Sequence, residues 1–334
     1  KQKTAYEVMP SLVGSEMCIR DRDYGKLVHG NEMLNLGCTR VELGIQTVYD
    51  DLLEIMNRSH TVQDSIESIR TLKDIGFKLN FHMMLGLPGS TIKRDIEALK
   101  KLFEDENFRP DMLKLYPCMV LKGTKLYEIY KKNKYKPLTT EQAANLIAEF
   151  KRYVPEYVRI MRVQRDIPTF ITEAGVDRTN LRQYVQKIIR SRNIKCRCIR
   201  CREIGNSINK LHDYRIKVLH YNASKGNEFF ISAETNDKLI GFCRLRFPSQ
   251  KLRKEITDDA ALIRELHVYG ESMPIGAKGK IQHRGIGRSL LKEAERLART
   301  YYKHKMVVIA GIGVREYYRK FGYRLEGPYM TKRI

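Results

Sequence analysis

Short apolar runs alternate with longer segments of helical period over the first half of the chain. The strands are expected over residues 39–47, 77–85 and 112–120, where apolar and polar side chains alternate or apolar side chains follow one another. Apolar residues at helical spacing fill residues 52–75 and 91–103, and Ser90 is expected as the N-cap of the second of these helices. Strands and helices in this order predict βα units around a parallel sheet.

After residue 205 the period shortens, and turns rich in Asn, Asp, Gly and Lys separate apolar runs. An antiparallel meander is expected from strands over residues 214–221, 227–235, 238–247 and 261–270. It is followed by a helix from Ile286 to about Tyr302, a strand over 306–313, a short helix over 315–322 and a final strand over 323–332. The order therefore predicts an α+β domain.

The patterns divide the chain into four parts. Residues 1–32 contain a stretch without clear period, and we set them aside as a foreign leader. An incomplete βα barrel is expected over 33–178, a basic linker over 179–205, and the α+β domain over 206–334. The linker begins with a basic amphipathic helix, because Leu181 and Val185 share an apolar stripe.

The composition shows a surplus of positive charge, which bears on the kind of partner the chain binds. The 334 residues are 42% hydrophobic, which suffices for globular cores, and 62 Lys and Arg against 39 Asp and Glu give a net charge of +23. Such a surplus favours a polyanionic partner, nucleic acid first, over its alternative of a charged soluble surface. No apolar run reaches the roughly 20 residues of a membrane span, and no secretory signal is present. A cytoplasmic protein without a membrane partner is expected.

Three of the seven cysteines, Cys196, Cys198 and Cys201, fall within six residues of the linker. Thiolates at this spacing favour zinc, which takes four ligands, and Cys38, Cys118 and His212 remain open as the fourth. The alternative is three free thiols. Phosphates of RNA are expected to bind the surrounding cations Arg162, Arg165, Lys187, Arg190, Arg192, Lys195, Arg197, Arg200 and Arg202.

A glycine-containing segment precedes the helix that begins at Ile286. Unpaired amides and the positive end of the helix dipole suit a diphosphate there, and glycines let it approach the backbone. The expected binding residues are Gln282, His283, Arg284, Gly285, Ile286, Gly287 and Arg288. A plain turn before a surface helix is the alternative for these residues alone.

The motif QxxGxG at 282–287, with the string YYRKFGY at 317–323, resembles the GNAT acetyltransferase family. The resemblance implies acetyl-CoA as the bound nucleotide, with Tyr318 favoured as the acid that protonates the departing thiolate and Tyr317 as its packing neighbour. Glu265 and His267 alternate on one strand and share a face, so they are candidates for base or orienter. A satisfied structural pair is the alternative.

Several further strings are similar to the catalytic subunit of Elongator, among them RVELGIQTVYDDLLEIMNRSHT, FHMMLGLPGS, CRCIRCREIG and RELHVYG. This resemblance implies a partial parallel radical S-adenosylmethionine (SAM) barrel, a zinc-binding basic linker and a GNAT domain. It further implies a tRNA carboxymethyluridine synthase, an acyltransferase that modifies carbon 5 of the wobble uridine. The expected partners are the anticodon region of tRNA, with accessory subunits or self-association.

The chain departs from that family because the three-cysteine motif for a [4Fe–4S] cluster is absent. The cysteines at 196, 198 and 201 do not replace it, since their first gap is one residue where the radical family has three or more. We therefore expect an N-terminally truncated chain whose radical step is inactive, with the cluster present only in the full-length parent.

Polar residues on the barrel strands match positions near the SAM site of the family. Glu42, Gln46 and Lys114 are the candidates, with strand-end polarity and a solvated lysine as alternatives. His82 is expected as a hydrogen-bonded interior residue without a catalytic role.

The function predicted for the parent is wobble-uridine carboxymethylation with acetyl-CoA and SAM. Two alternatives stay open, a protein lysine acetyltransferase and a non-catalytic RNA-binding remnant.

Overall fold

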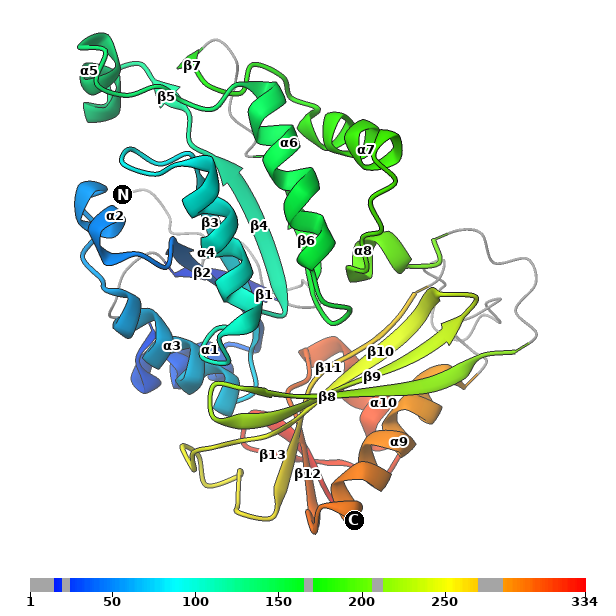
Figure 1. Cartoon of the computed structure of the whole chain (residues 1–334). Coiled ribbons are helices and arrows are strands. Elements are labelled where there is room, and N and C mark those ends of the chain that lie inside the picture. The colour runs from blue at the N-terminus through cyan, green and yellow to red at the C-terminus, as the bar shows by residue number, and fades with distance from the viewer. Residues whose placement is uncertain (1–14, 20–24, 165–170, 206–212, 270–284) are drawn as a thin grey trace.

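The computed structural model describes residues 15–19, 25–164, 171–205, 213–269 and 285–334, with the backbone alone for 15–19. Two sheets dominate it, one in the upper and one in the lower half of Figure 1. Within the described ranges, no helix combines the length and the apolar character that a membrane crossing needs.

The N-terminal sheet is parallel, as the alternation of strands and helices predicts. Its strand order is β1-β2-β3-β4-β6, and each neighbouring pair runs parallel. The strands are β1 (Ser15–Ile19), β2 (Cys38–Gln46), β3 (Lys78–Leu85), β4 (Met112–Pro117) and β6 (Arg159–Arg162). The helices are α1 (Leu27–Asn35), α2 (Asp50–Ile55), α3 (Val62–Asp74), α4 (Ile92–Glu104), α5 (Lys125–Lys131) and α6 (Thr140–Phe150).

Local sequence explains where these helices begin. Thr61 and Thr139 form capping boxes at the starts of α3 and α6. Thr91, not Ser90, is the N-cap of α4, because its side chain accepts from the Arg94 amide. The Ser90 hydroxyl instead donates to Asp95 Oδ1 at 2.5 Å.

Part of the segment that the sequence sets apart as a leader takes part in the fold. Strand β1 lies parallel to β2, and α1 crosses the expected boundary at residue 32 and buries Met33 and Leu34. A small two-stranded sheet of β5 (Val120–Leu121) and β7 (Thr172–Ala174) lies beside α5 at the top of Figure 1.

The second sheet contains the predicted meander and has the order β13-β14-β12-β11-β10-β9-β8. Its strands are β8 (Arg215–Ala223), β9 (Gly226–Thr235), β10 (Lys238–Phe247), β11 (Ala260–Val268), β12 (Lys305–Val308), β13 (Arg324–Glu326) and β14 (Tyr329–Arg333). Helix α9 (Ile286–Thr300), the turn η5 (Ile312–Val314) and helix α10 (Arg315–Arg319) complete it. The final predicted strand is thus wrong as a single element, because Gly327, with φ of 57°, turns it into a hairpin.

The two sheets share a buried interface. Phe242 and Leu262 on the second sheet belong to the same apolar cluster as the barrel core. Arg264 donates to both oxygens of Asp111, at the start of β4, over 2.7 and 2.6 Å, and Arg246 donates to Asp74 at the end of α3. All these charged groups are at most 1% exposed.

The basic linker runs along one side of both halves. It consists of α7 (Leu181–Ser191) and α8 (Ile199–Arg202), which follow the barrel and lead toward the second sheet (Figure 1). Leu181 and Val185 are buried, as their helical spacing predicts. The 3-10 turn η3 (Lys151–Tyr153) ends α6 and reaches the linker through Lys151.

Candidate functional site

The start of α9 has the geometry of an anion site. Gly285, the N-cap, has φ of 78°, and a Cβ built on it would meet no atom within 4 Å. No described side chain caps the helix, and its first turn carries no acidic residue. The amides of Ile286, Gly287 and Arg288 therefore lack intrahelical partners. Gln282, His283 and Arg284 lie outside the described residues.

Strands β11 and β12 diverge beside this helix. Their parallel pairing joins residues 260–263 to 305–308, and the Ile309 amide makes a last bond to the Ile263 carbonyl. β11 continues to Val268, paired on its other side with β10. Among the described residues, no pairing links 264–268 to β12. This stretch leaves a strand edge next to α9, where an extended amide-bearing chain finds partners.

The two adjacent tyrosines of α10 lie in different environments. Tyr318 is 5% exposed and packs in the core against Tyr323, with ring centroids 5.8 Å apart. Tyr317 is 36% exposed, and its hydroxyl would lie 2.6 Å from a Cβ placed on Gly287. Burial raises the pKa of both phenols. The hydroxyl next to the start of α9 therefore belongs to Tyr317, whereas the sequence favoured Tyr318.

Glu265 and His267 share a face of β11, as their spacing predicts, and that face is turned toward the barrel. Glu265 accepts from Arg244 Nε at 2.9 Å, and its other oxygen lies 4.0 Å from Lys78 Nζ. Burial opposes ionisation, but these cations hold the pKa of Glu265 below its ordinary value. Burial lowers the pKa of His267, which packs on Tyr269. The ion pairs of Glu265 are thus with Arg244 and Lys78, whereas the sequence left open a satisfied structural pair of Glu265 and His267 as the alternative.

A polar cluster lies in the barrel, formed by Glu42, Asn80, His82 and Lys114, and we call it the barrel cluster. Glu42 Oε1 accepts from Asn80 Nδ2 at 3.1 Å, and Oε2 contacts His82 Nε2 at 2.7 Å and Lys114 Nζ. Burial alone would raise the pKa of Glu42, but the hydrogen bonds to His82 and Lys114 and the charges of these two groups lower it to about 2. Asn80 Oδ1 is buried without a hydrogen-bond partner among the described residues.

The sequence predicted two members of the barrel cluster and missed the other two. Glu42 and Lys114 are brought together as expected of one pocket, and His82 is indeed hydrogen-bonded in the interior. The signal that joins them is register, because Glu42 pairs with Asn80 on the next strand and His82 pairs with Lys114 on the one after. Gln46 ends β2 with φ of 68°.

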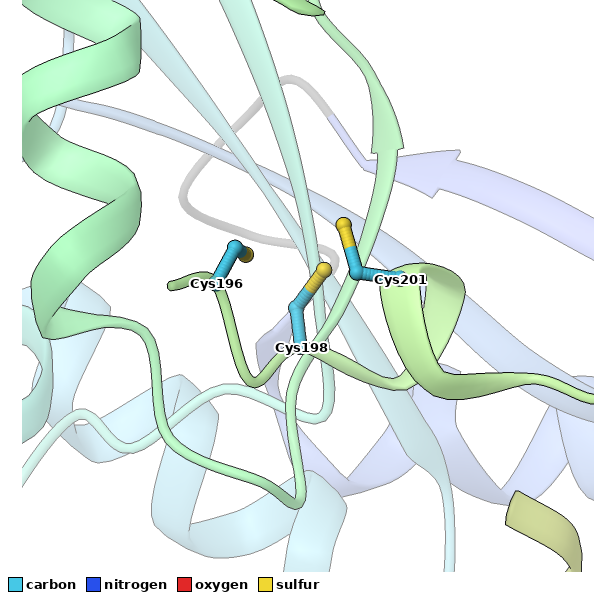
Figure 2. Close-up of side chains that lie close together, drawn as sticks. All are labelled: Cys196, Cys198 and Cys201. Atoms are coloured by element: carbon cyan, nitrogen blue, oxygen red, sulfur yellow. The ribbon is translucent and has the colours of Figure 1, made fainter. Parts of the chain in front are cut away.

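The cysteines of the linker converge, and we call Cys196, Cys198 and Cys201 the thiol cluster. Their sulfur atoms lie within 4.8 Å of one another, and Figure 2 shows the three side chains gathered around one point at the start of α8. A tetrahedral zinc centre with bonds of about 2.3 Å needs sulfurs roughly 3.8 Å apart, so the cluster fits it with small adjustments.

The other proposed zinc ligands lie elsewhere or outside the described residues. Cys38 packs in the barrel core, and Cys118 in a separate apolar cluster. His212 is outside the described ranges. Lys151, 5% exposed, fills one side of the thiol cluster, with Nζ 3.6 Å from Cys201 Sγ and 4.0 Å from Cys198 Sγ. Sequence spacing gives no sign of this lysine.

The predicted phosphate-binding cations divide by burial. Exposed cations are Arg162, Lys187, Arg190, Arg192, Lys195 and Arg200. Arg197 is paired with Glu156, and Arg202 is 5% exposed and bonded to Glu234, so a burial cost keeps Arg202 from a phosphate. Arg165 lies outside the described residues. A groove of about 510 Å³ between α6 and α7 is lined by Arg178, Tyr184, Lys187 and Arg192 among others.

Three family models match successive parts of the chain. The radical SAM superfamily matches residues 30–102, the radical SAM C-terminal domain 110–191, and the acetyltransferase (GNAT) family 201–323. The fold thus defines a class of protein in which a radical SAM domain and a GNAT domain are fused.

Individual relatives narrow this class. A tRNA uridine(34) acetyltransferase from Methanocaldococcus jannaschii is 46% identical over 95% of this chain and 61% of its own length. Elongator complex protein 3 from Homo sapiens is 43% identical over 93% and 59%. The archaeal Methanocaldococcus infernus Elp3 structure with an N-terminal deletion superposes with a TM-score of 0.91 at 43% identity, covering 96% of this chain and 78% of that one. The chain belongs to the Elp3 family, and it spans about three fifths of the curated relatives it matches.

Proposed function

We propose that the chain is part of an enzyme that carboxymethylates carbon 5 of the wobble uridine in tRNA with acetyl-CoA and SAM. The observation that carries the proposal is the fixed association of two sites, the start of α9 and the barrel cluster, on domains joined by buried ion pairs. The names of the relatives, tRNA uridine(34) acetyltransferase and Elongator complex protein 3, supply the substrate.

In this proposal the diphosphate of acetyl-CoA binds the amides of Ile286, Gly287 and Arg288, with residues 282–284 and the Arg288 side chain adding polar contacts and charge. The pantetheine arm follows the free edge of β11 at 264–268. The hydroxyl of Tyr317 then holds the proton for the thiolate, because it lies beside Gly287, and Tyr318 supports it by packing on it. Glu265 and His267 orient the strand on the barrel side.

The barrel cluster is proposed to bind SAM. The Glu42 carboxylate is held ionised and accepts hydroxyl donors, and the unpartnered Asn80 Oδ1 accepts a further one. Lys114 orients Glu42, and Gln46 lies at the end of the same strand. SAM with an iron–sulfur cluster supplies radical chemistry. The three-cysteine motif that holds such a cluster is absent from the residues of this sequence, and we propose that these residues alone perform no radical step.

Zinc is proposed for the thiol cluster, where three convergent thiolates select a soft metal in a reducing compartment. The cysteines of the described part are all free, which suits the cytoplasm. The anticodon region of tRNA is proposed to lie on the exposed cations of α7 and the linker. There the groove between α6 and α7 offers Lys187 and Arg192 to phosphates and Tyr184 for stacking.

Incubation of the chain with acetyl-CoA and tRNA tests the proposal. We expect thioester hydrolysis that tRNA stimulates, measured by release of free thiol. Acetylation of lysine peptides without any effect of tRNA would instead establish a protein acetyltransferase. Binding of tRNA without turnover at any concentration would leave an RNA-binding remnant and contradict the proposed enzyme.

A further inference from the structure

Lys151 is a buried cation without a carboxylate partner among the described residues. It opens η3, directly after α6, and is 5% exposed. Its ammonium takes part in no ion pair with Asp or Glu in the part of the chain that the structure describes. Within the described ranges its side-chain hydrogen bonds reach only sulfur, Cys201 Sγ at 3.6 Å and Cys198 Sγ at 4.0 Å.

Neutral thiols do not compensate such a charge. Burying an ammonium costs several kcal/mol unless an anion or strong acceptor faces it, and a thiol is a weak acceptor. Thiolates are strong ones, and three thiolates on a divalent metal carry one net negative charge. One ammonium brings that total to zero. The thiol cluster together with Lys151 is therefore balanced when a divalent metal is bound.

We propose that Lys151 is a positioning residue of the metal centre, which donates N–H···S bonds to Cys198 and Cys201 and neutralises the three-thiolate site. This inference rests on the zinc proposed for the thiol cluster. The bonds hold two of the ligands in place and draw electron density from their sulfurs, which weakens attack by protons or electrophiles. Charge balance also selects a neutral fourth ligand over a fourth thiolate.

A second cation offers a matched control. Arg182 of α7 lies within electrostatic reach of Cys198 and Cys201, but its guanidinium donates to the Met161 carbonyl at 3.0 Å. A Lys151→Met variant loses charge and N–H···S bonds, whereas Arg182→Met loses only a neighbouring charge and a bond to a carbonyl. Comparison of the two variants separates the effect of hydrogen bonds to sulfur from the effect of a nearby positive charge.

The test uses the whole chain, loaded with zinc or with cobalt(II). Zinc release to a chromogenic chelator and the thiolate-to-cobalt absorption band are measured for wild type, Lys151→Met, Lys151→Arg and Arg182→Met. We expect one metal per wild-type chain and release at least about tenfold faster from Lys151→Met, with a shifted cobalt band. Lys151→Arg should restore slow release, and Arg182→Met should resemble wild type.

The outcomes separate the two proposals. A wild-type chain that binds no metal removes the zinc assignment and this inference with it. Equal release rates and equal cobalt bands in wild type and Lys151→Met remove only the role of Lys151, as does an Arg182→Met variant with the same defect. If Lys151→Met does not fold, Lys151→Arg decides, because its different donor geometry should shift the cobalt band at full metal content, and an unchanged band contradicts the proposal.

Discussion

The adjacent tyrosines Tyr317 and Tyr318 of α10 lie in different environments, and we propose different roles for them. Replacement of Tyr317 by Phe should slow thioester turnover about a hundredfold or more, because it removes the proposed acid beside the start of α9, while acetyl-CoA affinity in calorimetry stays close to wild type. Tyr318→Phe is the matched control, since that phenol lies in the core, and it should keep most activity. Slow turnover in Tyr318→Phe with normal turnover in Tyr317→Phe would reverse the assignment.

The low pKa of the Glu42 carboxylate leads to a prediction about how the stability of the fold depends on pH. Its folded pKa of about 2 lies below the ordinary 4.5, so its bonds stabilise the fold above pH 4.5, and that contribution is lost as pH falls through 2. Glu42→Gln should therefore be less stable than wild type at neutral pH in urea unfolding, and the difference should shrink between pH 4.5 and 2.

The same variant, Glu42→Gln, also tests the proposed SAM site, through its affinity for SAM. The amide cannot hold two hydroxyl donors and the Lys114 ammonium together, so calorimetry should record weaker binding than in wild type. An exposed acid on the same half of the chain, changed by Glu97→Gln, is the control and should leave binding unchanged. A pH-independent stability difference would show that the carboxylate is not held ionised.

Residue type and spacing in the sequence predict for some groups of side chains that they lie close together, and for other groups they do not. Three cysteines within six residues predict their own convergence, because a short chain cannot separate them far. Glu42 and Lys114 are 72 positions apart, and they meet because β3 lies between their strands. Lys151 could not be found from spacing, since its distance to the thiol cluster depends on how η3 packs against α8.

At the scale of elements, periodic segments were predicted and turns were not. The α9 prediction ended within two residues of the helix, because its apolar face repeats without interruption. The last strand was predicted as one run and is a hairpin, since Gly327 adopts a positive φ that no periodicity reveals. β1 falls in the segment set aside as a leader, where the absence of a clear period hid a short strand.

The start of α9 allows a prediction about one backbone position. Gly285→Ala should weaken acetyl-CoA binding about tenfold or more, measured by calorimetry, because φ of 78° disfavours a Cβ and the methyl would occupy the open space before the helix. Gly123→Ala is a matched control, with the same φ of 78° and equally open surroundings, but far along the chain on the barrel side. Equal affinity losses in both variants would mean that strain alone, and not a ligand at α9, causes the effect.

At the scale of the whole molecule, buried charged residues lie in the interface between the two sheets. Arg244, Arg246 and Arg264 alternate with apolar residues, a pattern typical of a sheet with one solvated face. That face instead packs on the barrel, where Asp74 and Asp111 of the barrel and Glu228 of β9 meet the three guanidinium groups. The alternation of polar and apolar residues along a strand cannot distinguish a solvated sheet face from a buried ionic one, because both require polar residues at every second position.

This interface gives a prediction for the stability of the assembly as a whole. Asp111→Asn leaves Arg264 buried without its bidentate partner, and loss of one member of a buried pair costs about 3–5 kcal/mol. We expect denaturant unfolding to change from one transition to two, as the second sheet separates from the barrel, with early hydrogen exchange at residues 77–79 and 262–264. Lys93→Gln breaks an exposed pair with Glu97 and should change stability by less than about 1 kcal/mol. If both variants unfold like wild type in a single transition, the ion pairs do not hold the two halves together, and the tRNA-stimulated turnover proposed above cannot depend on them.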